Sequence, residues 1–262
     1  MGLIMITGAS DGLGRALAGT LAAQGHRLVV HGRDETRLAE VAAATGARAI
    51  RADLSSLADV RQLAARVHAE YDRLDVLVNN AGVGFGPAGE PRQLSADGHE
   101  LRLAVNYLAP YLLSRLLLPL LRRAAPARIV NVASIGQADV DLDDLMLDRG
   151  YDRFVAYRRA KLALIADTFG LAEDLAGSGV TVNALHPATL MPTTMVRDAG
   201  MDRVEPLETG LRATLRLVVD PDLAGTTGRY FDRDQEARAR EQAYDPGFRA
   251  RLRSVTQRLV GA

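Results

Sequence analysis

The residues that decide the fold are the stretch TGASDGLG at positions 7–14, which follows a short apolar run beginning at Leu3. Glycines between a strand and a helix let the backbone approach the pyrophosphate of a dinucleotide, whose charge the N-terminus of the following helix stabilises. Such a turn is a weak signal by itself, and a purely structural strand-to-helix turn is the alternative. Here a helical pattern opens at Arg15 within a βαβ unit, and this context predicts a dinucleotide-binding turn.

Beyond this turn, short β-branched or leucine-rich runs alternate with helical patterns, as in a parallel sheet covered by helices on both faces. No repeat, low-complexity tract or linker in the sequence argues for a second domain. We therefore predict an α/β fold, a single Rossmann-type, doubly wound domain over residues 1–262 with a seven-stranded, mostly parallel sheet. The expected strands are Leu3–Thr7, Leu28–His31, Arg48–Ala52, Val76–Asn79, Arg128–Val132, Val180–Leu185 and Gly228–Phe231, and the expected helices begin at Arg15, Glu35, Leu57, Ala96, Leu112, Val155 and Glu208.

Composition narrows the classes of function. The 262 residues suit one large α/β domain, and the 48 % hydrophobic content can fill its core. Lys plus Arg equals Asp plus Glu at 32 each, so no net field attracts nucleic acid or an acidic membrane. The chain has no cysteine, which excludes disulfides, thiolate metal sites and a cysteine nucleophile. The five histidines lack metal-ligand spacing, so we expect no metal and a small-molecule partner.

The two ends of the chain and its most apolar stretch indicate where in the cell we expect the protein. The first strand begins at Leu3, too early for a signal peptide, so we expect a cytoplasmic protein. The apolar stretch Tyr107–Leu121 is interrupted by two prolines and falls short of the roughly 20 residues needed to span a bilayer. We expect it to be a buried helix or a subunit contact rather than a membrane span. The tail after Asp232 alternates Arg and Glu without a strong apolar stripe, which predicts a surface helix that could join copies of the chain in a homo-oligomer.

Tyr157 and Lys161 lie four residues apart in a predicted helix. This spacing puts the phenol and the ammonium on one face, side by side. The positive charge should favour the tyrosinate and lower the pKa of the phenol from its ordinary value of about 10. A tyrosine that titrates nearer neutrality can exchange protons with an alcohol or a carbonyl oxygen, so the pair indicates a redox enzyme.

The end of the second strand bears on cofactor choice. Folds that prefer NAD usually place an acid there to bind the ribose 2′-hydroxyl. This chain has Gly32 and Arg33 at that place, and Arg33 offers a planar fork for a 2′-phosphate, which favours NADP(H) over NAD(H). Asp34 supports the opposite choice, because a register shifted by two residues would make it the ribose acid. Its position before Glu35 is more typical of a helix N-cap.

A series of motifs follows the glycine turn along the chain. In order, the sequence has the TGxxxGxG motif, Asp53, Asn79-Asn80-Ala81-Gly82, Asn106, Ser134, Tyr157-x-x-x-Lys161 and His186-Pro187. In this order the motifs resemble the short-chain dehydrogenase/reductase family over nearly the whole chain. Three further features are a wide gap between Ser134 and Tyr157, an Asp-rich insertion at Asp139–Gly150 and the Gly225–Phe231 ending. They resemble the retinol-dehydrogenase and WW-domain-oxidoreductase branch and its bacterial relatives.

The resemblance implies four catalytic roles. Tyr157 would be the acid/base, and Ser134 would polarise the same substrate oxygen. Lys161 would bind the nicotinamide ribose and lower the pKa of the tyrosine, while Asn106 would hold a water that links Lys161 to solvent. Taken singly, each could be an ordinary core-edge or surface residue, but the four occur together in the family's order.

The resemblance also implies a set of cofactor contacts. Asp53 and Leu54 would meet the adenine, although Asp53 could instead cap the helix that follows it. Ala188 replaces a usual glycine and lacks its freedom at positive φ, so the backbone that receives the carboxamide could run differently, and both Thr189 and Thr193 are candidates for that contact. The implied cofactor-binding residues are Gly8, Ser10, Asp11, Gly12, Leu13, Gly14, Arg33, Asp53, Leu54, Asn80, Ala81, Gly82, Tyr157, Lys161, Pro187 and Thr189.

Two segments interrupt the regular alternation and are candidate specificity loops. Pro187–Pro206 is rich in Thr, Met, Pro and Gly, which predicts a mobile lid over cofactor and substrate. Asp139–Gly150 carries five aspartates and is either a substrate loop or only a solvated one.

These observations predict an NADP(H)-dependent oxidoreductase that acts on a carbonyl or alcohol of a hydrophobic small molecule. A non-catalytic NADP-binding regulator of the same fold is one alternative, although it would lose the tyrosine. An NAD-dependent alcohol dehydrogenase is another. A nucleotide-sugar epimerase or dehydratase fits less well, because its glycine spacing differs and its substrate domain needs a longer chain.

Overall fold

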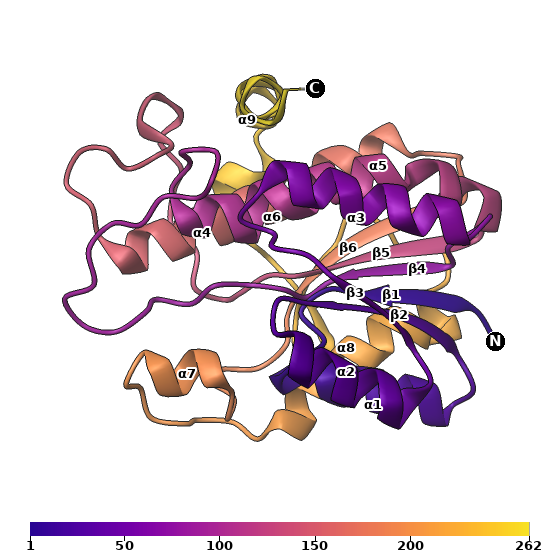
Figure 1. The fold of residues 1–262 in the computed structure, drawn as a ribbon. Helices are drawn as coiled ribbons and strands as arrows, with labels where there is room; N and C mark the ends of the chain where they lie inside the picture. Colours follow the sequence, from indigo (N-terminus) through magenta and orange to yellow (C-terminus); the bar gives the residue numbers. More distant parts are fainter. Residues whose placement is uncertain (262) are drawn as a thin grey trace.

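The computed structural model describes residues 1–261, in which one sheet lies between two layers of helices (Figure 1). Eight strands lie in the order β3-β2-β1-β4-β5-β6-β7-β8, parallel except for the last pair. The strands are β1 (Leu3–Ile6), β2 (Arg27–Gly32), β3 (Arg48–Arg51), β4 (Val76–Asn79), β5 (Ala127–Val132), β6 (Val180–His186), β7 (Tyr230–Asp232) and β8 (Gln235–Ala237).

The helices divide between the two faces of the sheet. One face carries α1 (Gly12–Ala23), α2 (Glu35–Thr45) and α8 (Leu207–Val219), and the other carries α3 (Leu57–Glu70), α5 (Ala109–Ala124) and α6 (Arg153–Asp174) (Figure 1). Side chains of β1 alternate between the two cores: Leu3 and Met5 join the core under α3, α5 and α6, while Ile4 and Ile6 join the other. Burial on both faces explains why the strands are apolar without alternation.

The doubly wound α/β fold is therefore confirmed. The strand order reverses at β1, which pairs with β2 on one side and β4 on the other. In such sheets ligands bind where the loops after these central strands separate. Figure 1 shows that end of the sheet on the left, between the short helix α7 (Thr194–Asp198) and the loops that follow β4 and β5.

The predicted count of seven strands is wrong by one. β8 pairs antiparallel with β7 through a turn in which Arg233 adopts φ +57. Its three residues, Gln235, Glu236 and Ala237, bury little surface and show no apolar alternation. The strand is defined by its backbone pairing with β7, which sequence patterning does not record.

The prediction of two separate helices beginning at Ala96 and at Leu112 is also wrong. Residues 101–124 form one continuous helix, made of α4 (Leu101–Leu103), a π-helical turn (Ala104–Leu108) and α5. The π turn adds a residue to the helical repeat and so shifts the apolar stripe, which made one helix resemble two. This helix is long and apolar enough to cross a membrane, and 78 % of its most apolar window is buried inside the fold. The absence of a membrane span stays a prediction.

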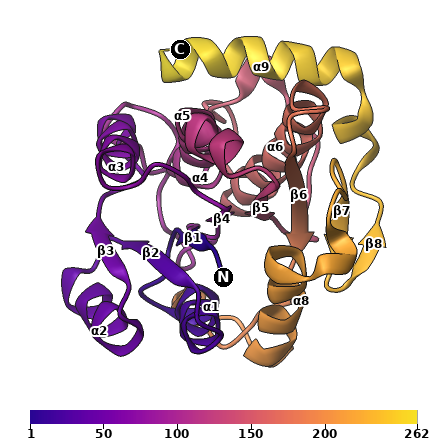
Figure 2. The same ribbon diagram turned by 90° about the vertical axis from the view of Figure 1, so that its right-hand side faces the viewer.

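The C-terminal helix α9 (Pro246–Val260) corrects the expectation of a surface helix without an apolar stripe. It lies across the α5–α6 layer (Figure 2) and buries a stripe of four residues at every fourth position. Thr256 in that stripe bonds the hydroxyl of Tyr107 at 2.7 Å. Between the stripe residues the helix is rich in arginine, which hid the pattern in the sequence. The buried residues of α9 are Phe248, Leu252, Thr256 and Val260.

Candidate active site

The glycine turn after β1 is held in place by His31 of β2. The N–H of Gly8 donates to His31 Nδ1 at 3.3 Å, and the N–H of Ala9 donates to the His31 carbonyl at 2.8 Å. Burial lowers the pKa of His31 to about 4, so the imidazole is neutral near pH 7. Because Nδ1 accepts a hydrogen bond, Nε2 carries the hydrogen and donates to the carbonyl of Ala52 at 3.1 Å.

Two glycines of the turn occupy places that no side chain could share. Gly8 has φ +66, and a Cβ there would lie 2.7 Å from Ala81 Cα. A Cβ on Gly14 would lie 2.2 Å from the carbonyl oxygen of Gly8. The helix α1 begins at Gly12, and its N-cap residue Asp11 makes no side-chain hydrogen bond to the first N–H groups. A tight turn that leads into an uncapped helix N-terminus fits the pyrophosphate of a dinucleotide.

The segment after β4 packs directly against this turn. Thr7 Oγ1 accepts the N–H groups of Asn80 and Ala81, both at 3.0 Å. The Asn80 side-chain amide donates to the carbonyls of Thr7 at 2.8 Å and Gly8 at 3.1 Å. The structure thus brings together two motifs that lie more than 70 residues apart in the chain.

The ends of β2 and β3 bring positive charge beside the glycine turn. Arg33 is exposed, and Arg51 Nε donates to its carbonyl at 3.1 Å. A Cβ on Gly32 would lie 2.9 Å from Ser10 Oγ, so Ser10 is adjacent. Asp34 caps α2 by accepting the N–H of Arg37 at 3.0 Å, in agreement with the N-cap interpretation. Arg51 was missed from the sequence, because only the β2–β3 pairing places it beside Arg33.

Asp53 and Leu54 follow β3 at the same end of the sheet. Asp53 Oδ1 accepts the N–H of Ser55 at 2.9 Å, while Ser56 is the N-cap of α3. Asp53 therefore orders the turn before α3 without being the cap itself. Leu54 is buried, with 4 % of its surface exposed.

Ser134, which follows β5, lies near Tyr157 of α6. Ser134 Oγ accepts the N–H of Gly136 at 3.0 Å, so its own hydrogen is available for donation. The Ser134 carbonyl accepts the Tyr230 hydroxyl and Gln137 Nε2, both at 3.1 Å. Burial raises the pKa of Tyr157 above its ordinary value, and a side-chain hydrogen bond with Ser134 opposes that shift.

The pKa of Tyr157 differs from the expectation that Lys161 would lower it. Lys161 Nζ donates to the Val132 carbonyl at 2.8 Å and lies 5.7 Å from the Tyr157 ring centre. Here burial of the phenol outweighs any attraction by the ammonium. Burial also lowers the pKa of Lys161 to about 8.

Asn106 lies in the π-helical turn and is fully buried. Its side-chain amide donates to the Val83 carbonyl at 2.9 Å and accepts the Val83 N–H at 2.7 Å. A Cβ on Gly82 would lie 3.2 Å from Asn106 Oδ1 and 3.6 Å from Lys161 Nζ. The predicted catalytic residues Asn106, Ser134, Tyr157 and Lys161 therefore gather beside the segment that follows β4.

The predicted lid at Pro187–Pro206 closes at its base through two backbone bonds, from Val204 N to Leu190 O and from Glu205 N to Thr189 O, both 3.1 Å. Glu205 also accepts the N–H of Thr189 at 2.6 Å and pairs with Arg233 at 2.7 Å. Arg233 holds the pKa of Glu205 down at about 2.

The tip of this segment, which contains α7, reaches the glycine turn. A Cβ on Gly12 would lie 2.9 Å from Thr193 Cγ2, and one on Gly84 would lie 2.4 Å from Met195 Cγ. Thr189 Oγ1 instead lies 3.1 Å from His186 Nε2, so the two threonines face different neighbours. The left-handed residue near Pro187 is Leu190, with φ +47, rather than Ala188.

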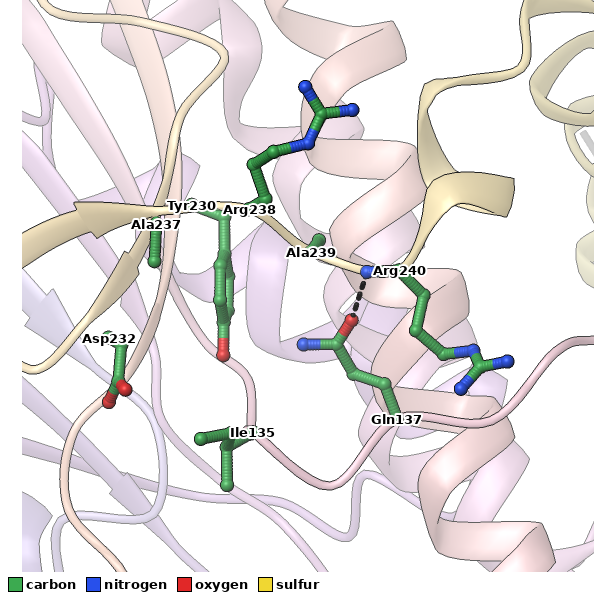
Figure 3. A pocket seen from close by; sticks show the side chains of 8 residues that line it. All are labelled: Ile135, Gln137, Tyr230, Asp232, Ala237, Arg238, Ala239 and Arg240. Atoms are coloured by element: carbon green, nitrogen blue, oxygen red, sulfur yellow. Dashed lines mark hydrogen bonds between the residues drawn. The ribbon is translucent and has the colours of Figure 1, made fainter.

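The Asp-rich insertion is more than a solvated loop. Val140, Leu145 and Leu147 are buried, while Asp139 pairs with Arg240 at 2.7 Å. The residues just before this insertion border a cavity of about 300 Å³ beside Ser134 (Figure 3). Figure 3 shows Gln137 bonded to the backbone N–H of Arg240 across the cavity, at 2.8 Å. The cavity is lined by Ile135, Gln137, Tyr230, Asp232, Ala237, Arg238, Ala239 and Arg240.

A doubly wound sheet with a dinucleotide-type turn and a serine, a tyrosine and a lysine at its carboxyl end defines the nicotinamide-dependent oxidoreductases as a class. Residues 2–203 match the family model described as short chain dehydrogenase. The chain is 34 % identical to retinol dehydrogenase 14 of Mus musculus, covering 98 % of this chain and 85 % of the relative. This chain belongs to the short-chain dehydrogenase family, in its retinol dehydrogenase branch.

Solved structures agree with this assignment. An uncharacterised protein from Mycobacterium paratuberculosis matches with a TM-score of 0.81 and 28 % identity, covering 100 % of this chain and 94 % of its own. The Pseudomonas aeruginosa RhlG/NADP active-site complex matches with a TM-score of 0.72 and 30 % identity, covering 88 % and 94 % respectively. The part of the chain within 1–261 shows no group of three or more His, Asp or Glu side chains placed to hold a metal ion.

Proposed function

We propose that this protein is an NADP(H)-dependent oxidoreductase that interconverts a carbonyl and an alcohol on a hydrophobic small molecule. When bound, the nicotinamide supplies or accepts the hydride. Tyr157 gives a proton to the carbonyl oxygen in reduction and takes it back in oxidation. The observation that carries the proposal is the position of three side chains at the carboxyl end of the sheet: Ser134, whose Oγ accepts the Gly136 N–H at 3.0 Å, and Lys161, whose Nζ lies 2.8 Å from the Val132 carbonyl and 5.7 Å from the Tyr157 ring centre.

The chain's own residues divide the work. Tyr230 and Gln137 hold the Ser134 carbonyl, and the Gly136 N–H holds its Oγ, so the side-chain oxygen keeps a fixed position. Lys161 is buried with its ammonium on the Val132 carbonyl, close to Gly82, where it can bind a ribose hydroxyl. The raised pKa of Tyr157 keeps the phenol protonated, as a proton donor for reduction must be.

The preference for NADP(H) is supported by the end of β2. Arg33 and Arg51 lie beside Ser10, whereas the Asp34 carboxylate accepts the Arg37 N–H at the N-terminus of α2. A 2′-phosphate would meet two guanidinium groups there. The alternative, an NAD-dependent alcohol dehydrogenase, would need Asp34 to leave its capping position.

The test of function compares Tyr157→Phe with Tyr71→Phe, a matched loss of a phenol hydroxyl remote from the site. With NADPH and an apolar aldehyde, Tyr157→Phe should lose about 10²–10⁴-fold in kcat/KM, because a positioned general acid contributes that much. Its NADPH Kd should stay near the parent value, and Tyr71→Phe should match the parent. Equal turnover in Tyr157→Phe and the parent would refute the role of Tyr157. No turnover by the parent across a panel of aldehydes, ketones and alcohols would favour the non-catalytic regulator.

A further inference from the structure

Two phenylalanines form an aromatic cluster with Tyr157, in which Phe85 is the central ring. Phe85, on the loop after β4, meets Tyr157 edge-on with ring centres 4.7 Å apart. Phe154, one turn before Tyr157 on α6, lies 4.7 Å from Phe85. All three residues are partly exposed, so the cluster presents ring surface beside the proposed proton donor. No sequence pattern indicated this cluster, because Phe85 and Tyr157 meet only through the tertiary fold.

The backbone of Phe85 is held by a buried arginine. Arg102, at the start of the helix over 101–124, is 1 % exposed. Its Nη2 donates to the Phe85 carbonyl at 2.6 Å and lies 3.1 Å from Glu90 Oε2. Its Nη1 donates to the Tyr151 hydroxyl at 2.8 Å and lies 3.5 Å from Glu100 Oε1. Burying a cation costs free energy unless its partners are fixed. We therefore interpret Arg102 as a residue that positions the Phe85 backbone rather than one that adds to the stability of the fold.

The loop around Phe85 has little room to move. Gly86 adopts φ +70, and a Cβ there would lie 2.0 Å from Glu90 Oε2. Arg153 donates to the Gly86 carbonyl and places its guanidinium 4.7 Å from the Phe154 ring centre. The aromatic surface is therefore fixed before any substrate arrives, which lowers the entropy cost of binding.

We propose that Phe85 and Phe154 form an aromatic wall of the substrate site that selects flat, aromatic or conjugated carbonyls and alcohols, with Arg102 as the positioning residue for Phe85. The wall rests on the proposed function, since it takes Tyr157 as the proton donor. Aromatic rings gain about 0.5–1.5 kcal/mol from each other beyond area burial. A flat ring can stack on or meet this wall edge-on, whereas a puckered ring of the same size makes poorer contact.

The experiment uses benzaldehyde and cyclohexanecarbaldehyde, which have equal carbon counts and differ in flatness. The ratio of their kcat/KM values is measured with saturating NADPH for the parent, Phe85→Leu and Leu94→Ala. Leu94 is the matched control, an apolar residue 53 % exposed on the same connection after β4. Intrinsic reactivity cancels when ratios are compared between enzymes. Phe85→Leu should lower the ratio about three- to tenfold, mainly through KM, and Leu94→Ala should leave it unchanged.

Arg102→Lys tests positioning, with Glu90→Gln as a gentler variant that weakens one ion pair and keeps a hydrogen-bonding side chain. Both should lower the same ratio without changing the NADPH Kd. Equal loss of kcat/KM for the two aldehydes would show a merely structural role and overturn the positioning claim.

A binding measurement separates the wall from the reaction. Kd values of both aldehydes are measured on Tyr157→Phe with NADPH, with and without Phe85→Leu. A binding preference for benzaldehyde that Phe85→Leu removes would support the wall even if the parent shows no turnover, an outcome that would refute only the proposed function. A ratio that Phe85→Leu leaves unchanged in turnover and in binding, or failure of both aldehydes to bind, would overturn the wall.

Discussion

At the residue scale, our proposal for cofactor choice depends on Arg33 and its neighbours. The guanidinium is exposed at the end of β2, Arg51 lies alongside, and Asp34 is engaged by the N–H of Arg37. Phosphate recognition needs such donors in addition to an open turn. Arg33 follows β2, and Arg51 is at the end of the neighbouring strand β3. A charge change at Arg33 should therefore affect the binding of the 2′-phosphate more than the rest of the cofactor.

The parent should bind NADPH at least about tenfold more tightly than NADH, equal to about 1.4 kcal/mol. Arg33→Asp should reverse this preference, because it replaces a phosphate donor with an acid that suits a ribose hydroxyl. Fluorescence titration with both cofactors measures it, with Arg66→Asp on the exposed face of α3 as the control. Equal affinities in the parent would show that Asp34 is the ribose acid after all.

His31 predicts an acid-sensitive fold. Burial lowers its pKa from an ordinary 6.5 to about 4 in the folded chain, while the charges of Arg33 and Asp53 have smaller and opposite effects. The full contribution of the neutral imidazole is therefore present above pH 6.5. As pH falls from 6.5 towards 4, the unfolded chain binds a proton that the folded chain refuses, so the free energy of unfolding falls.

The share due to His31 should reach roughly 2–3 kcal/mol by pH 4.5. Urea unfolding from pH 7.5 to 4.5 measures it, and His31→Gln should lose less stability over this range than the parent. His186, whose pKa burial also lowers to about 4, should keep part of the pH dependence in that variant. His68→Gln, on the exposed face of α3, is the control and should follow the parent. An identical pH profile in His31→Gln would contradict the assignment.

At the scale of elements, the segment Pro187–Pro206 has a fixed base and a tip that reaches the cofactor site. Thr189 and Leu190 bond Glu205 and Val204 at the base, and Arg233 holds Glu205. Thr193 and Met195 at the tip lie against glycines of the turn and of the segment after β4. A loop with a closed base can open by moving its tip alone.

Trypsin should therefore cut the free enzyme after Arg197 and Arg203, which lie near the tip. NADPH at ten times its Kd should slow these cuts about tenfold, because only the open form is cleaved. Mass spectrometry of the fragments follows them, and Arg73, between α3 and β4, serves as an internal control with an exposed side chain. Equal rates with and without NADPH would mean that the segment is rigid framework, and the mobile substrate wall should then be sought in Asp139–Gly150.

At the scale of the whole molecule, α9 completes the core on the α5–α6 side (Figure 2). Leu252 is 1 % exposed in the middle of its buried stripe, and Tyr107 bonds Thr256 nearby. These contacts join the end of the chain to its central helix, far from the glycine turn in sequence. A substitution in the buried stripe of α9 should therefore lower the stability of the fold without changing the kinetic constants of the folded enzyme.

Leu252→Ala should lower the free energy of unfolding by about 2–5 kcal/mol, the range for removing a buried leucine. Its KM values should stay unchanged where it is folded. Gln257→Ala, exposed on the same helix, should change stability by less than about 0.5 kcal/mol. Urea unfolding and steady-state kinetics check both. A neutral Leu252→Ala would mean that α9 adds little to the core.

Features that depend on local spacing could be predicted from the sequence alone. The TGxxxGxG turn, the alternation of apolar runs with helical patterns and the pair Tyr157 and Lys161 are each specified within a few residues, because turn geometry, burial and helical repeat are local. These were enough to predict the doubly wound fold, confirmed here, and the family. The N-cap role of Asp34 was local as well.

Tertiary structure decided what depends on pairing between distant segments. The eighth strand exists only through β7, and the buried stripe of α9 only through the helices beneath it. Burial of Tyr157 reversed the direction expected for its pKa, since desolvation depends on everything packed around the phenol. Arg51 beside Arg33, and Phe85 beside Tyr157, are neighbours that no spacing along the chain could reveal, because the sheet and the helix packing bring them together.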